Sequence, residues 1–63
     1  MKKKDLEKRL RELGWTFLRH GGSHDIWHNG KGEQEQVPRH NEVNERLAKA
    51  ILKVAKSTPG ENK

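Results

Sequence analysis

The sequence predicts a small α+β domain in which a helix, three antiparallel strands and a second helix follow one another along the chain. Two amphipathic stretches near the ends carry apolar residues every three or four positions, as packed helices do. Between them lie short runs of aromatic and β-branched residues separated by glycine clusters, which is typical of strands joined by tight turns. Because such short connections keep sequence neighbours adjacent, we expect both helices on one face of a three-stranded sheet, with the other face open.

The first helix is expected over residues 3–13, because three leucines recur there at intervals of four and three among charged residues: Leu6, Leu10 and Leu13. Gly14 follows and suits the left-handed conformation that ends many helices. Residues 15–20 are rich in aromatic and β-branched side chains and predict the first strand. The Gly-Gly-Ser cluster at residues 21–23 ends it.

Residues 24–28 predict a second strand, and Asn29-Gly30 after it is a strong signal for a two-residue hairpin turn, extended by Lys31 and Gly32. A third strand is expected over residues 33–37. It is polar at most positions and is stopped by Pro38, which indicates an edge position in the sheet.

The second helix is expected to begin after Asn41, whose side chain can cap the free amides of the first turn, and to run to about Lys56. Its apolar residues predict one continuous stripe that faces the core: Val43, Leu47, Ala50, Ile51, Val54 and Ala55. Three aromatic residues, Trp15, Phe17 and Trp27, are expected mostly in the core of so small a domain.

With 63 residues the chain has room for one domain, which we expect to span residues 1–56, with residues 57–63 as a flexible tail. There is no cysteine, so disulfides and thiolate zinc sites are excluded and the composition fits a reducing cytoplasm. The basic N-terminus is not followed by an apolar run, so neither a signal peptide nor a transmembrane helix is expected.

Basic residues outnumber acidic ones by 14 to 9, and both ends of the chain are basic while the middle is not. This distribution favours a polyanionic partner such as a nucleic-acid backbone, because each phosphate that is neutralised releases counterions and adds affinity. A basic surface that serves solubility alone fits the same composition.

Among four histidines, His20, His24 and His28 are spaced four apart, as zinc ligands on a helix would be, but the glycines at 21 and 22 argue against a helix. No metal and no small-molecule cofactor are therefore expected. His24 follows a turn of Gly22 and Ser23, and its imidazole can take the proton from a ribose 2'-hydroxyl, which then attacks the adjacent phosphorus. Arg19, Lys31 and the turn amides can stabilise the charge that develops. On these residues alone, His24 is equally compatible with an ordinary polar residue beside a turn.

Three segments of the chain resemble the HicA (YcfA-like) toxin family: Arg19-His20-Gly21-Gly22-Ser23-His24, Val37-Pro38-Arg39-His40 and Ala50-Ile51-Leu52-Lys53. The resemblance extends from the first helix to about Lys56. It implies a fold like that of double-stranded-RNA-binding domains, ribosome-independent endoribonuclease activity on mRNA, a HicB-type antitoxin as protein partner, and His24 as the catalytic histidine. The glycine that the family often carries before its Ile-Leu-Lys segment is absent from residues 44–49, which predicts a more regular helix without an effect on catalysis.

The remaining candidates surround this motif. His40 matches the family's Pro-x-His position, and we expect it to hold the loop before the second helix; it and His28 are second choices for an acid or base. The cations expected to bind RNA are Arg19, Lys31, Lys4 and Lys8, the last two from a basic, solvated first-helix face that also carries Lys2, Lys3, Arg9 and Arg11. If Trp27 faced out, it could instead stack on a base or contact the antitoxin.

The sequence thus predicts a metal-independent mRNA endoribonuclease that acts in the cytoplasm as the toxin of a type II toxin–antitoxin system. Two alternatives remain open at this point. The chain could be a non-catalytic double-stranded-RNA-binding module, which would have no need of the Gly-Ser-His turn, or a subunit that acts only through a protein partner.

Overall fold

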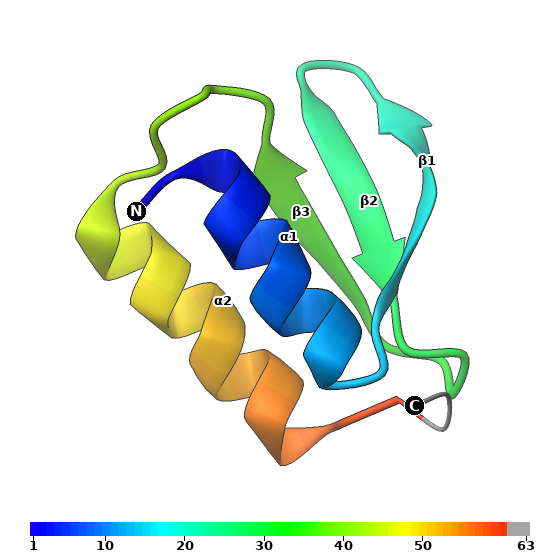
Figure 1. Ribbon diagram of the computed structural model, residues 1–63. Helices are drawn as coiled ribbons and strands as arrows, with labels where there is room; N and C mark the ends of the chain where they lie inside the picture. The colour runs from blue at the N-terminus through cyan, green and yellow to red at the C-terminus, as the bar shows by residue number, and fades with distance from the viewer. Residues whose placement is uncertain (61–63) are drawn as a thin grey trace.

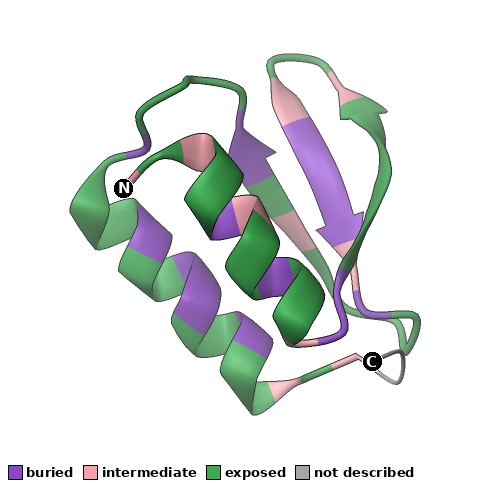
Figure 2. Cartoon of the chain, in the orientation of Figure 1, coloured by how far each residue is buried: buried purple, intermediate pink, exposed green. Residues whose placement is uncertain are grey.

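The computed structural model describes residues 1–60 and confirms the α+β fold and its element order (Figure 1). The elements are α1 (Lys3–Glu12), β1 (Thr16–Gly21), β2 (His24–His28), β3 (Gln34–Pro38) and α2 (Glu45–Ser57). The strands form one antiparallel sheet in the order β1-β2-β3. Both helices lie on the same face of this sheet, and their buried residues form a stripe on the sides that face it and each other (Figures 1 and 2).

The strand register fixes which side chains face the helices. In β2, Asp25 and Trp27 face the helices, while His24, Ile26 and His28 alternate with them on the opposite, open face. A bulge between Phe17 and Arg19 of β1 leaves Arg19 opposite Ile26, Gly21 opposite His24 and His20 opposite Asp25. Arg19 and His24 therefore share the open face, and His20 and Asp25 share the helix face.

The edge position of β3 is confirmed, but the connection from β2 is a five-residue loop over residues 29–33 and not a two-residue turn. The buried Asn29 side chain organises this loop. Its Oδ1 accepts hydrogen bonds from the amides of Lys31 (2.8 Å) and Glu33 (3.3 Å), and its Nδ2 donates to the Thr58 carbonyl (2.9 Å). A side chain that replaces the hairpin hydrogen bonds in this way favours the longer loop.

The prediction that Asn41 caps the second helix is wrong, because α2 begins three residues later with Asn44 as its cap. The Asn44 Oδ1 accepts from the amides of Arg46 (2.9 Å) and Leu47 (3.3 Å). The Asn41 carbonyl instead accepts a hydrogen bond from the Lys3 amide (2.8 Å). Residues 41–43 are thus held against the N-terminus and are not available to form a helical turn.

The predicted core face of α2 is also partly wrong. Leu47 and Val54 are 42% and 41% exposed and Ala50 is exposed too, while the helix buries a neighbouring stripe: Ala48, Ile51, Leu52 and Ala55. These four positions follow helical spacing as well as the predicted set does. The later start of α2 places Val43 in the loop, where it is still buried, and removes it from the helical stripe.

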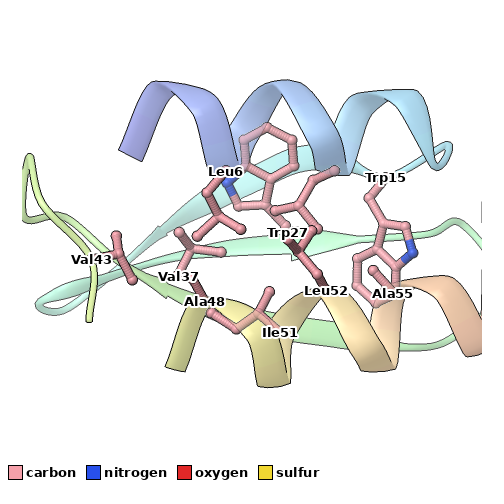
Figure 3. Close-up of a cluster of buried hydrophobic side chains, with 10 residues drawn as sticks. Leu6, Trp15, Trp27, Val37, Val43, Ala48, Ile51, Leu52 and Ala55 are labelled. Carbon is pink, nitrogen blue, oxygen red and sulfur yellow. The ribbon is translucent and has the colours of Figure 1, made fainter. Parts of the chain in front are cut away.

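The core lies between the two helices and the sheet (Figure 3). Trp27 and Trp15 are buried there as expected, and the guanidinium of Arg11 lies over the Trp27 ring at 5.7 Å. Phe17 is 45% exposed, so its predicted core position is wrong. It lies on β1, the edge strand, where it contacts the Trp27 ring edge-on at 6.3 Å and is not covered by a helix.

Residues 57–60, the first part of the expected flexible tail, end α2 and contact the rest of the fold. The Thr58 carbonyl accepts from the indole of Trp15 (3.0 Å), and the Gly60 amide donates to the Leu13 carbonyl (2.8 Å). A Cβ at Gly60 would overlap the Gly14 carbonyl, so this close approach requires glycine. Residues 61–63 of the expected tail lie outside the described part of the chain. Within residues 1–60, no helix is long and apolar enough to cross a membrane.

Candidate functional site

His24 begins β2 directly after a two-residue turn in which Gly22 has a φ of +55°, a conformation that favours glycine. The turn and the pairing of His24 with Gly21 and Pro38 place the imidazole on the open face, where the residue is half-buried. The Ser23 Oγ lies 3.3 Å from the imidazole Nδ1. A hydroxyl at this nitrogen can fix the ring tautomer, as second partners of functional histidines do.

Arg19 lies beside His24 on the open face. Its Nη1 is 3.4 Å from the position that a Cβ would occupy at Gly21, and Gly21 is the strand partner of His24. The missing side chain of Gly21 thus leaves room for the guanidinium next to the histidine. The structure brings together four of the predicted site residues here: Arg19, Gly22, Ser23 and His24.

Two predicted residues lie at the other end of the sheet. His28 is on the same face as His24, but four residues of extended strand separate the two by roughly 13 Å. Lys31 follows in the loop after β2 and is farther still. Neither side chain is placed to act on the same phosphodiester as His24.

The predicted residues on α1 and in the loop after β3 are split between two regions. His40 is exposed two residues after Pro38, the strand partner of His24, and is therefore at the His24 end. Main-chain hydrogen bonds attach this loop to the N-terminus, from Lys3 N to Asn41 O and from Val43 N to Met1 O, each 2.8 Å. The expectation that His40 holds the loop stays a prediction.

Lys4 and Lys8 are both exposed on α1, which covers the helix side of the sheet. Lys4, in the first turn, lies near Asn41 at the His24 end of the fold. Lys8 lines a groove between the helices together with Glu12 and Glu45, so it is on the side of the molecule away from His24.

Asp25 is the residue that sequence reasoning missed. Its side chain is 5% exposed on the helix face and accepts three hydrogen bonds from basic side chains: Lys3 Nζ at 2.8 Å to Oδ2, His20 Nδ1 at 2.8 Å to Oδ1, and Arg39 Nε at 3.1 Å to Oδ1. We call these four residues the Asp25 cluster. They join α1, β1, β2 and the loop after β3 at the end of the sheet that carries His24.

The electrostatics of the Asp25 cluster follow from these contacts. The hydrogen bond from Lys3, opposed by burial and helped by His20, lowers the pKa of Asp25 to about 2. The same bond from Asp25 raises the pKa of Lys3 against its own partial desolvation. Because Asp25 is a carboxylate at neutral pH and can only accept, the Nδ1 of His20 carries a hydrogen and its Nε2 is the free nitrogen.

One signal in the sequence points to the Asp25 cluster. Asp25 is an acid that alternates with the outward-facing His24 in a predicted strand, so it must face the helices, where a carboxylate needs cationic or hydrogen-bonding partners. Which cations provide them depends on tertiary contacts to Lys3 and Arg39, 22 and 14 residues away.

A search among protein families matches residues 4–56 to the model described as the HicA toxin of bacterial toxin–antitoxin systems. Searches of curated proteins and of solved structures found no match. The matched segment runs from α1 through most of α2 and includes the turn that carries His24. The chain therefore belongs to the HicA toxin family of bacterial toxin–antitoxin systems.

Proposed function

We propose that this HicA toxin is an endoribonuclease that cleaves mRNA with His24. The position of His24 carries the proposal: the imidazole is half-buried on the open face, follows a glycine turn, contacts Ser23 through Nδ1 and has Arg19 beside it. A histidine with one ring nitrogen held and the other free suits proton transfer near neutral pH.

In the proposed reaction, His24 Nε2 accepts the proton of a ribose 2'-hydroxyl while Nδ1–H donates to Ser23 Oγ. The 2'-oxygen attacks the adjacent phosphorus, the bond from phosphorus to the 5'-oxygen breaks, and the 5'-oxygen takes up a proton. The products are a 2',3'-cyclic phosphate and a 5'-hydroxyl. Because the RNA provides its own nucleophile, the protein has only to move protons and stabilise charge.

Arg19 and the amides of Gly22 and Ser23 are the groups that we propose to stabilise the phosphoryl oxygens, since Arg19 extends over Gly21, the strand partner of His24, and the two amides belong to the turn directly before His24. Of the two other histidines considered as the acid for the 5'-oxygen, His40 is favoured because it lies at the same end of the sheet. His28 is disfavoured by its separation from His24 along β2.

Membership of the HicA family implies a cognate antitoxin. We propose that this partner is of the HicB type, that it acts in the cytoplasm, and that it covers His24, because an active nuclease must be inhibited in the cell that makes it. With Trp27 buried, any such contact involves the exposed residues around His24 and not the indole.

Cleavage of a long mRNA in EDTA by wild type, His24→Ala and His28→Ala tests the proposal. His28→Ala is the matched control, since it removes the same side chain from the same strand and face. Loss of the general base lowers the rate by roughly a hundredfold to ten-thousandfold, so His24→Ala is expected to be nearly inactive and His28→Ala active. An unchanged rate for folded His24→Ala refutes the proposal. Salt-dependent RNA binding without cleavage by wild type points instead to a non-catalytic RNA-binding module.

A further inference from the structure

The Asp25 cluster is not used by the reaction at His24, yet it is more completely organised than the His24 site. Its carboxylate is buried and receives hydrogen bonds from three basic side chains on three different segments. Lys3 is 20% exposed and also pairs with Glu7 at 3.2 Å, so its charge is engaged inside the fold. His20 and Arg39 differ, because their side chains are 70% and 44% exposed.

His20 and Arg39 converge because both bind the same oxygen, Asp25 Oδ1, at 2.8 Å and 3.1 Å. Asp25 engages Nδ1 of His20 and Nε of Arg39. The two terminal nitrogens of the guanidinium therefore remain to donate to a ligand, and the Nε2 of the imidazole joins them as a third donor when both ring nitrogens are protonated. Two side chains held next to each other by one buried anchor match the demands of a phosphate, which the guanidinium can bind with two parallel hydrogen bonds and the imidazolium with one more.

We propose that His20 and Arg39, anchored by Asp25, form a binding site for a phosphate of the RNA backbone. This site lies on the helix side of β2, whereas His24 lies on the open side of the same end of the strand, so an RNA that passes over the turn at Gly22 and Ser23 contacts both. This phosphate site rests on the proposed function, because the choice of RNA as its ligand follows from the proposed endoribonuclease activity.

Two neighbouring features favour an RNA backbone over a free phosphate. The Phe17 ring is 45% exposed and lies 5.0 Å from the His20 ring, edge-on, which gives an aromatic surface for a base next to the donors. Lys2 and Lys4 are exposed at the start of α1, beside Lys3 of the cluster. Their charge extends the positive surface along which a polyanionic strand can lie.

The first test replaces each of two arginines by lysine, which keeps the positive charge and removes the planar guanidinium. Binding of a short labelled single-stranded RNA is measured in the His24→Ala protein, so that the probe stays intact. Arg39→Lys keeps the charge but loses the planar fork, and we expect the affinity to fall about threefold to tenfold. Arg46→Lys is the matched control on the exposed first turn of α2 and is expected to bind as the parent does. Equal effects of the two substitutions overturn the proposal.

Asp25→Asn gives a second test in which the sign of the effect decides. If net charge alone governed binding, removing an acid would tighten it. If Asp25 anchors the two donors, its loss weakens binding although the protein becomes more positive. Tighter binding by a folded Asp25→Asn protein overturns the proposal, and if this variant does not fold, His20→Gln, which we expect to weaken binding, takes its place.

Titration of inorganic phosphate into nitrogen-15-labelled protein locates the site directly. We expect the His20 ring nitrogens to shift, with no comparable shift for His28 at the other end of the sheet. Absence of a His20 shift overturns the proposal, and so does a shift combined with unchanged RNA binding by Arg39→Lys. These readouts do not depend on cleavage, so a failure of wild type to cut mRNA would refute the proposed function and leave this site intact.

Discussion

His24 and Asp25 are adjacent in the chain, but their side chains lie on opposite faces of the sheet. His24 faces the open side, where Ser23 and Arg19 lie beside it, and Asp25 faces the helices, where it binds Lys3 and Arg39. The backbone that carries the candidate catalytic imidazole is thereby attached to α1 and to the loop after β3. Stability at Asp25 and activity at His24 are consequently expected to be linked.

The pKa of Asp25 predicts acid sensitivity. Its pKa is lowered from 3.8 to about 2 in the fold, so the stability that the Asp25 cluster contributes is fully present above about pH 4 and is lost as the pH falls through 2. Thermal unfolding followed by circular dichroism between pH 5 and pH 2 measures this loss. Asp25→Asn is expected to lower the Tm by about 5–10 °C at neutral pH and to make the Tm depend less on pH below pH 4. If the Tm of the variant falls below pH 4 as steeply as that of wild type, Asp25 is not the source of the acid sensitivity.

Two glycines distinguish the role of the turn from the general cost of a strained backbone. Gly22 (φ +55°) and Gly30 (φ +78°) both have open space where a Cβ would lie, so alanine at either strains only the backbone, by about 1 kcal/mol. We expect both substitutions to lower the free energy of unfolding in urea similarly. Only Gly22→Ala, next to His24, is expected to reduce cleavage, and equal cleavage by the two variants would contradict a role for the turn geometry.

The position of the α2 cap can be checked by two asparagine substitutions. Asn44→Ala removes the side chain that accepts from Arg46 and Leu47 and is expected to cost about 1 kcal/mol. Asn41→Ala keeps the backbone carbonyl that binds Lys3, so its cost is expected to be much smaller. Urea unfolding of both variants measures the difference, and a larger effect at Asn41 would restore the helix start that the sequence suggested.

Two cations at opposite ends of the sheet separate local charge from total charge. Arg19→Gln and Lys31→Gln each remove one positive charge, but only Arg19 lies beside His24. We expect Arg19→Gln to lower the cleavage rate by about tenfold or more and Lys31→Gln to change it little. Cleavage of one RNA at several salt concentrations gives both rates, and equal losses would show that only net charge matters.

The parts of the fold that were predictable depend on local chemistry. The structure confirms three predictions for which the local sequence favours a single conformation. These are the helix with the leucine spacing of α1, the left-handed Gly14 (φ 88°) that follows it, and the strand alternation that buries Trp27. Asn41 and Asn44 are both good caps, and tertiary hydrogen bonds of residues 41–43 to the N-terminus decide between them. The two apolar stripes of α2 were equally helical, and packing against the sheet selects the one that includes Leu52.

Within the candidate site, the residues that belong to the sequence motif of residues 19–24 were predictable. The sequence placed Gly22, Ser23, His24 and Arg19 together because they are close in the chain. It could not exclude Lys31, whose distance from His24 depends on the length and direction of β2. The inward-facing Asp25 was open to prediction from the strand alternation, but its partners come from other segments of the chain, so only the packed structure shows which basic side chains bind it.

End-group analysis of the fragments that wild type produces from a long mRNA in EDTA tests directly whether His24 activates the 2'-hydroxyl of the RNA. We expect 2',3'-cyclic phosphate and 5'-hydroxyl ends, formed by wild type and His28→Ala and not by His24→Ala. Fragments with 5'-phosphate ends, or fragments formed equally by His24→Ala, would contradict it.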